Sequence, residues 1–475
     1  MSTAKINRFI QIFNDAFTQL AADIPMPHIE RLAILVHRAM ENRTRKYHTS
    51  MHLFKLCESL DARAQLAALF HDLVYYQLDG SFPQQTHSLL GKVCHHENGG
   101  FILQEMSNDP LATMCAEIFN FEPYQALPLY GGMNEFLSAI VAVRLLKPYL
   151  PMSDLIAIAA CIEATIPFRD TENKDYCQLA EKVKQQYQKR LEMQDEAATD
   201  QYVARVMQDA ISLSNMDISS FAEPNPSTFL SSTWLLIEEA NTPLNEVGVY
   251  TLQDYRMALL RMEKFLHGLK ATVVFHQYDN NPDAKEYQRL TGAAQNNILF
   301  SRDFLAAKLT SIAVIEAIAV ETGGDCPVSM FLGDIHSNNG NRPVRAEDFL
   351  PVAPGAADIR PELLQVFEQG RSEKSDLDLN ASPLTAFLYR SLGHEGTLQA
   401  WRQAQRFFSG ELSALGFLKS IDSKLITAMV KACMHIAISR QEDLQYLHNA
   451  LSSSAPLAAT IALQDISSQN SIKTA

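Results

Sequence analysis

The chain has 475 residues, which is enough for two or three domains with cores of their own. Its 40 Lys and Arg residues against 54 Asp and Glu residues give a net charge of −14, and they form no basic block, which excludes a nucleic-acid polymer as the partner. The 7 cysteines are scattered without a CxxC pair, and no apolar segment is long and uncharged enough to span a membrane. We therefore expect a cytoplasmic protein with reduced thiols and no membrane contact.

Apolar side chains recur at the helical period through most of the chain. The segments before residue 270 that predict amphipathic or buried helices are 5–21, 30–41, 51–60, 62–76, 135–147, 152–165, 176–193, 200–214, 229–240 and 251–268. Alternation typical of strands occurs only at 271–278 and 326–335. Glycine, proline and asparagine predict loops at 77–87, 95–100 and 128–133. The predicted fold class is all-α.

The clearest candidate for a connection between domains is the segment 322–360, which is rich in Gly, Pro and Asn and follows a predicted helix at 303–321. Further helices are predicted beyond it, at 361–368, 383–392, 396–409, 411–420 and 424–451. We therefore predict one helical domain in residues 1–310 and a second helical domain of unknown role in residues 311–475.

Three histidines and an aspartate interrupt two otherwise apolar helices near the N-terminus. His48 and His52 are four residues apart, so on a helix they share one face, which apolar residues continue toward the core. His71 and Asp72 stand in the apolar stretch ALFHDLV. A buried carboxylate beside a buried imidazole is costly unless it is paired or binds a cation, and this mixture of ligands suits a divalent metal.

A further carboxylate is found at the end of the helix predicted at 200–214. Asp217 lies seven residues after Ala210, at an inward position where the pattern calls for an apolar residue. Taken alone, each of these side chains is more typical of a protein core, because an inward histidine usually bonds a backbone carbonyl. Two histidines one turn apart, followed by a His–Asp pair on the next helix, together predict a metal site.

The pattern of these residues resembles the HD superfamily of metal-dependent phosphohydrolases, helical domains named for their His–Asp pair. The motifs YHxxxH and AxxFHDxxY are matched by Tyr47, His48, His52, Ala67, Phe70, His71, Asp72 and Tyr75. Weaker similarities are an NExxSA helix start at 134–139, the stretch IEATI at 162–166, Asp217 in place of the last aspartate ligand, and a closing segment at 255–297. The resemblance covers roughly residues 1–305.

The resemblance implies a divalent metal, with Mn, Mg, Fe, Co, Ni and Zn not distinguished, and its ligands would be His52, His71, Asp72 and Asp217. It implies Glu135 as the acid/base residue, at the start of a helix that we expect Asn134 to cap; an exposed first-turn glutamate is the alternative. His48 would meet the phosphate or a second metal, although it could exchange roles with His52. Arg45 could clamp a phosphate through two hydrogen bonds or lie on the surface.

Two features depart from the family pattern. About sixty residues separate Asp72 from the NExxSA stretch, so we expect the segment 77–133 to form a lid or a partner surface. Pro167 and Phe168 stand where relatives with more metals often carry histidines, which favours one metal. A second metal at 95–97 (HHE) is the alternative, and a solvated loop is the more typical interpretation of that stretch.

We therefore expect metal-dependent hydrolysis of a phosphate ester, from a nucleotide or another small phosphorylated molecule. Two alternatives from other classes stay open. One is an HD-shaped module that senses a nucleotide or small phosphate without turnover. The other is a helical partner-binding protein, in which residues 311–475 bind a protein partner or a second copy of the chain.

Overall fold

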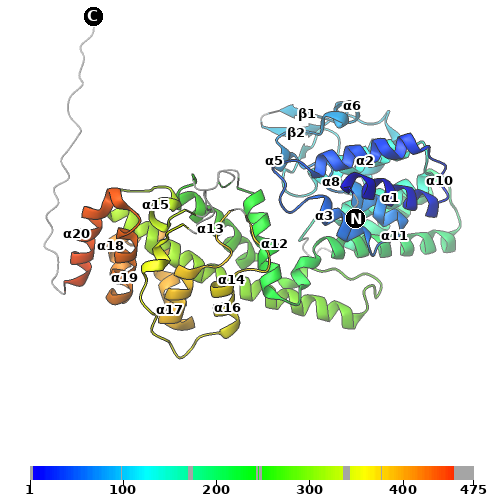
Figure 1. The fold of residues 1–475 in the computed structure, drawn as a ribbon. Helices are drawn as coiled ribbons and strands as arrows, with labels where there is room; N and C mark the ends of the chain where they lie inside the picture. The colour runs from blue at the N-terminus through cyan, green and yellow to red at the C-terminus, as the bar shows by residue number, and fades with distance from the viewer. Residues whose placement is uncertain are drawn as a thin grey trace, which may run out of the picture. The chain divides into compact units, whose positions relative to one another are not determined.

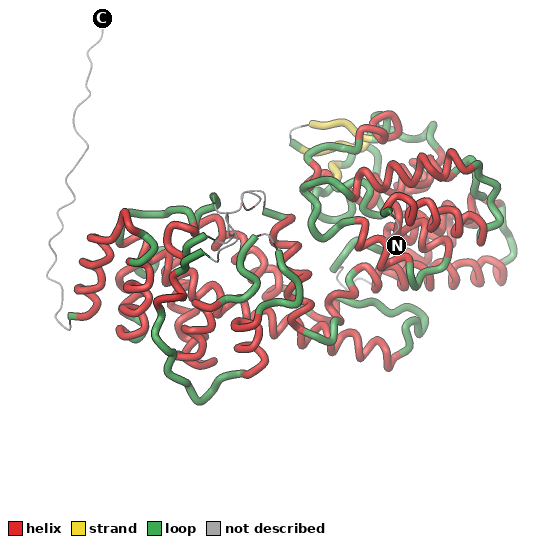
Figure 2. Tube along the Cα trace, viewed as in Figure 1, coloured by secondary structure: helices red, strands yellow, loops and turns green. Residues whose placement is uncertain are grey.

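Helices make up nearly all of the regular structure, so the predicted all-α class is confirmed. The computed structural model describes residues 4–453 except 98, 169–174, 242–243, 245–248, 335–342 and 376. Figure 1 labels the helices and strands, and Figure 2 distinguishes helix from loop along the trace. Within these described residues, no helix combines the length and the apolar character that crossing a membrane requires.

The contacts of the chain divide it into two compact units. The first unit comprises Met1–Tyr250, Asp254–Leu309 and Arg360–Pro383, and the second comprises Thr251–Gln253, Thr310–Ile359 and Leu384–Ala475. The domain limits expected from the sequence, 1–310 and 311–475, stay predictions. Part of the expected connection at 322–360, residues 335–342, lies outside the described residues.

The first unit holds the N-terminal helices and the small sheet. Its elements are α1 (Lys5–Gln19), α2 (Met26–Met40), α3 (Ser50–Cys57), α4 (Ala62–Phe70), α5 (Tyr76–Asp79), α6 (His87–Leu90), β1 (Cys94–Glu97), β2 (Gly100–Leu103), α7 (Pro110–Phe119), β3 (Ala126–Leu127), α8 (Met133–Leu146), α9 (Met152–Ala164), α10 (Asp175–Leu191), α11 (Glu196–Asp217), α12 (Pro226–Glu239), α13 (Leu252–Gly268), the first part of α14 (Ala284–Glu321) and α16 (Pro361–Gln369). Every helix predicted before residue 270 is present, with shifted ends.

Helix α9 is the centre of the N-terminal bundle and contacts α4, α8, α10 and α11. Its stretch LIAIAACIEA is apolar around almost the whole circumference, and every side chain from Leu155 to Ala164 is buried. A helix that is apolar on all sides is stable in water only when other helices surround it. The bundle around α9 therefore supplies the rigid frame on which α3, α4, α8 and α11 present their ends.

The segment 77–133 contains a sheet that the sequence patterns did not predict. β1 and β2 form an antiparallel hairpin, in which Cys94 pairs with Leu103, and β3 pairs with the other edge of β2. Figure 1 shows this hairpin at the end of the bundle where α6 ends. The loop expected at 95–100 is therefore wrong over most of its length.

The strands expected at 271–278 and 326–335 are also wrong. A 3₁₀ turn, η5 (Ala271–Val273), occupies the first of these segments, and α15 (Val328–Leu332) occupies the second. Short apolar runs do not distinguish a buried strand from a buried helical turn, because neither period is completed.

The segment 360–383 belongs to the first unit because a buried ionic cluster ties it there. The Asp378 carboxylate accepts hydrogen bonds from Tyr255 Oη at 2.5 Å and from Arg371 Nη2 at 2.7 Å. Lys308 Nζ of α14 lies 3.2 Å from the same carboxylate. Burial would raise the pKa of Asp378, but the two cations hold it below its ordinary value.

The second unit contains the end of α14, α15, a 3₁₀ turn η6 (Ala346–Phe349), α17 (Pro383–Phe408), α18 (Ala414–Lys419), α19 (Ser423–Met434) and α20 (Gln441–Ser452). Helix α17 is bent at Gly393, where φ is 73° and a Cβ would lie 1.8 Å from Oδ1 of Asp358. Only glycine fits this position, so the bend separates the two helices predicted at 383–392 and 396–409. Helices α19 and α20 pack against each other.

Candidate metal centre

The four predicted metal ligands meet where three helices end or begin. His52 lies in the first turn of α3, His71 and Asp72 directly follow the last residue of α4, and Asp217 is the last residue of α11. His52 Nε2 lies 2.9 Å from Asp217 Oδ1, and His71 Nε2 lies 2.9 Å from Asp72 Oδ2 and 3.3 Å from Asp217 Oδ1. One ligand atom each from His52, His71 and Asp72 falls within 4.8 Å of the others.

The hydrogen bonding of His71 shows that this cluster requires a positive charge next to Nε2. Its Nδ1 lies 2.8 Å from the carbonyl oxygen of Ala68, so Nδ1 carries a proton and donates it there. Nε2 is buried and has no hydrogen-bond partner of good geometry, although it faces two carboxylates. A lone pair against carboxylate oxygens is repulsive, so a positive charge must stand between them, either a proton on Nε2 or a metal ion.

The electrostatics of the cluster agree with this requirement. Burial would lower the pKa of His71, but Asp72 and Asp217 raise it well above its ordinary value. Burial would likewise raise the pKa of each aspartate, yet the imidazoles hold both carboxyls well below their usual range. Two imidazoles and two carboxylates are ligands that divalent metals accept, so these residues fit a metal ion.

His48 is not on α3, and the expectation that it shares a helix face with His52 is wrong. Helix α3 begins at Ser50, and His48 lies in the bend before it. Its ring is nevertheless 5.8 Å from the ring of His52, centroid to centroid, and it lines the same cavity as His71 and Asp72. Burial would lower the pKa of His48, but the neighbouring Glu239 and Asp72 carboxylates raise it.

Glu239, the last residue of α12, is a site residue that the sequence analysis missed. Its Oε1 lies 2.5 Å from His48 Nδ1, and its Oε2 accepts from the backbone N–H groups of Lys46, Tyr47 and His48 at 2.7, 2.9 and 3.2 Å. Its side chain is only 2% exposed. The signal was a pair of glutamates at the end of the apolar stretch WLLIEE, where a carboxylate is costly to bury without partners.

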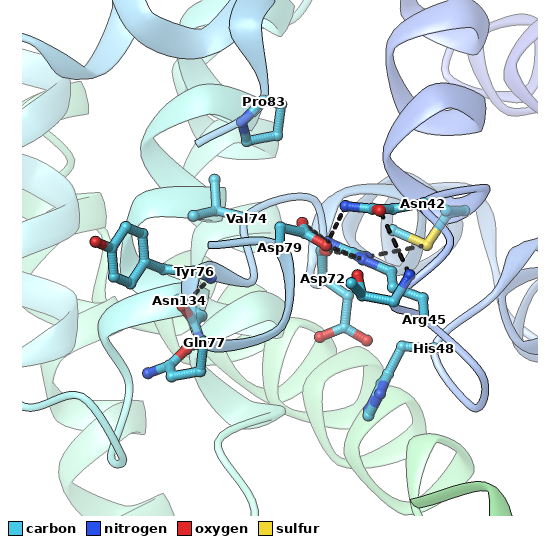
Figure 3. Close-up of polar contacts among 12 residues, drawn as sticks. Asn42, Arg45, His48, Asp72, Val74, Tyr76, Gln77, Asp79, Pro83 and Asn134 are labelled. Carbon is cyan, nitrogen blue, oxygen red and sulfur yellow. Dashed lines mark hydrogen bonds and ion pairs between the residues drawn. The ribbon is translucent and has the colours of Figure 1, made fainter. Parts of the chain in front are cut away.

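Arg45 does not reach the cavity, so its predicted role as a phosphate clamp has no support from this geometry. Its side chain is fully buried, and Nε and Nη2 bind the two carboxylate oxygens of Asp79 at 3.1 and 2.6 Å. Nη1 donates to the backbone carbonyl of Asp72 at 2.8 Å. Figure 3 shows this ion pair, with Asn42 also bonded to Asp79 and with the Asp72 carboxylate directed toward His48. Arg45 therefore holds Asp72 through its backbone carbonyl.

Glu135 lies in the first turn of α8 and lines the cavity. The expected cap is wrong, because Gly132 is the N-cap and Asn134 instead accepts from the backbone of Tyr76 and donates to Gln77. Burial raises the pKa of Glu135 to about 7, since the opposing hydrogen bond to its own backbone does not compensate. A carboxyl with this pKa exchanges protons readily near neutral pH.

The cavity has a volume of about 470 Å³, with a polar floor and an apolar mouth. We call its buried and half-buried ionisable residues the floor; they are His48, His71, Asp72, Glu135 and Asp217. The mouth includes Tyr130, Phe168 and Phe265, and the Tyr130 side chain is 88% exposed. Pro167 lines the cavity as well, whereas the histidines of the HHE stretch at 95–97 are exposed on the hairpin and are not among the described lining residues.

The close approach of the loop before α8 to the residues that follow α9 requires a glycine at position 132. Gly132 has φ 105°, and a Cβ there would lie 2.6 Å from Cδ1 of Ile166. Glycine therefore lets the loop before α8 approach Ile166, just after α9, and so places Glu135 at the cavity that His71 and Asp72 also line.

No family model matches this chain, and neither a curated protein nor a solved structure matches it.

Proposed function

We propose that the first unit hydrolyses a phosphate ester of a small molecule with the help of a divalent metal ion held by His52, His71, Asp72 and Asp217. The observation that carries the proposal is the buried His71 Nε2, which lies 2.9 Å from Asp72 Oδ2 and 3.3 Å from Asp217 Oδ1 without a hydrogen bond of good geometry, so that a positive charge is needed between these atoms. A cavity with an ionisable floor opens beside this cluster, as a substrate site requires. The resemblance of the sequence to HD phosphohydrolases supports the same reaction.

The residues at the floor have complementary roles in the proposed reaction. When bound, a divalent cation supplies a Lewis acid for the phosphoryl oxygens and lowers the pKa of water. Glu135 accepts the proton of the attacking water, because its pKa near 7 leaves a large fraction of the carboxylate free at neutral pH. His48 binds a phosphoryl oxygen or returns a proton to the leaving oxygen as the P–O bond breaks. The products are phosphate and an alcohol.

The mouth of the cavity favours esters with an apolar or aromatic group. Tyr130 and Phe265 are among the exposed large hydrophobic side chains of the chain, and both line this cavity. A nucleotide or an aryl phosphate would place its ring against them while its phosphate reaches the floor.

The test is elemental analysis of the purified full chain together with a phosphoester screen, applied to the wild type, to Asp72→Ala and to the matched control Asp23→Ala, whose side chain is exposed. We expect the wild type and the control to hold stoichiometric metal and to release phosphate, and Asp72→Ala to do neither. Equal metal content in Asp72→Ala and the wild type would refute the site assignment. A chain that binds metal and nucleotide but turns over no ester would instead be a sensing module.

A further inference from the structure

Glu239 ends a helix that begins more than 150 residues after the start of α3, yet its carboxylate bonds the loop that carries His48 at four atoms. Oε2 of Glu239 accepts hydrogen bonds from three successive backbone N–H groups, and Oε1 contacts Nδ1 of the His48 imidazole. Backbone donors that converge on one oxygen hold a loop in a single conformation, because each bond restricts the same few dihedral angles. The loop before α3 is therefore shaped by Glu239.

We propose that Glu239 is the positioning residue of this site: it keeps a proton on His48 Nδ1 and so directs Nε2 of His48 to the substrate. This inference rests on the proposed hydrolysis. A carboxylate 2.5 Å from Nδ1 can only accept, so Nδ1 is the protonated nitrogen in both the neutral and the charged ring. Nε2 is then the ring nitrogen that is left to meet a ligand in the cavity that the ring lines.

The neighbouring glutamate provides a matched control. Glu238 is also buried at the end of α12, and it contacts the same loop through Lys46, whose Nζ lies 3.2 Å from its Oε1. The partner of His48 Nδ1 is Oε1 of Glu239, 2.5 Å away. A substitution of Glu238 therefore disturbs the same helix end and loop without changing the partner of Nδ1.

Glu239→Gln changes the partner of His48 Nδ1 while it keeps the hydrogen bonds to the backbone of the loop. The amide oxygen of glutamine still accepts the backbone N–H groups, while its NH₂ group faces Nδ1 and donates to it. The neutral ring must then carry its proton on Nε2, which is the opposite tautomer. We expect turnover to fall by about 10–100-fold, the usual effect of removing a residue that orients a functional imidazole, with KM nearly unchanged.

The test is nitrogen NMR of the full chain labelled with ¹⁵N-histidine, in which the His48 signals are assigned by their loss in His48→Gln. We expect the wild type and Glu238→Gln to show a protonated Nδ1, and Glu239→Gln to show the proton on Nε2. In the kinetic arm, Glu239→Gln combined with His48→Gln should be no slower than His48→Gln alone, because Glu239 acts through that ring.

A neutral wild-type ring with its proton on Nε2 alone, or an unchanged tautomer of the neutral ring in Glu239→Gln, would overturn the inference. So would a double variant that is clearly slower than His48→Gln, because Glu239 would then act independently of His48. A failure of the proposed function is distinguishable: if the wild type turns over no ester, the hydrolysis proposal fails while the NMR arm still decides the role of Glu239.

Discussion

The buried ion pair between Arg45 and Asp79 offers a test that separates two roles for Arg45. As a phosphate clamp, Arg45 would change KM when it is replaced and would leave stability unchanged. As the structure has it, the guanidinium is fully buried, Asp79 is 6% exposed, and three hydrogen bonds join Arg45 to Asp79 and to the Asp72 carbonyl. Arg45→Met keeps much of the side-chain volume but removes all three bonds.

The expected loss of unfolding free energy follows from the few partners that the Asp79 carboxylate keeps in Arg45→Met. Among the described residues, the amide of Asn42, 2.8 Å from Oδ1, would be the one side-chain donor left to the buried Asp79 carboxylate. Breaking a buried ion pair on one side costs about 3–5 kcal/mol. At roughly 2 °C per kcal/mol for a unit of this size, the melting temperature should fall by about 6–10 °C.

The assay is thermal and urea unfolding of the wild type, Arg45→Met, Asp79→Leu and the double variant. Because the double variant buries no unpaired charge, we expect it to recover at least about 1–2 kcal/mol relative to Arg45→Met. Metal affinity should fall in Arg45→Met, since the carbonyl of Asp72 loses its donor. An unchanged melting temperature with a raised KM would refute this reasoning and restore the clamp.

Three further predictions concern the cluster and the pH dependence of stability. Added divalent metal should raise the melting temperature of the wild type and of the exposed control Asp23→Ala but not that of Asp72→Ala, because only a folded state that binds the ion is stabilised; an equal shift in all three would contradict the ligand set. Glu135→Gln should keep its metal while turnover falls by about two to four orders of magnitude, whereas the exposed control Glu122→Gln should match the wild type; unchanged turnover would assign the proton transfer to another group. Burial raises the pKa of Asp209 from 3.8 to about 7, so its protonated form stabilises the fold below about pH 4 and this contribution is lost as the pH rises through 7. Asp209→Asn, which stays neutral, should therefore exceed the wild type in unfolding free energy by on the order of 1–3 kcal/mol near pH 8 and match it near pH 4; no difference near pH 8 in urea unfolding would contradict the shift.

Much of the helical framework was predictable because its signals are local. The period of apolar residues predicted ten helices before residue 270 that the structure contains, but it missed α7 and the short helices α5 and α6. Helix α9 is buried on all sides, as its composition requires. The four ligand candidates were also predictable, since polar groups at inward helix positions need partners. The sheet at 94–127 was not predictable, because its strands span only two to four residues and no alternation is completed over that length.

The sequence by itself determined most of the helices, the burial of α9 and the identity of the four metal-ligand candidates, because each depends on residues within one or two turns. Only the tertiary structure decided where the site helices stop and what their ends face. Helix α4 ends at Phe70 because the backbone N–H of Val74 donates to Ser138 and the carbonyl of Asp72 accepts from Arg45. His48 turns away from α3 because Glu239, 191 residues later, binds its loop and its ring. These bonds replace helical hydrogen bonds with partners from distant parts of the chain, and no local pattern carries that information.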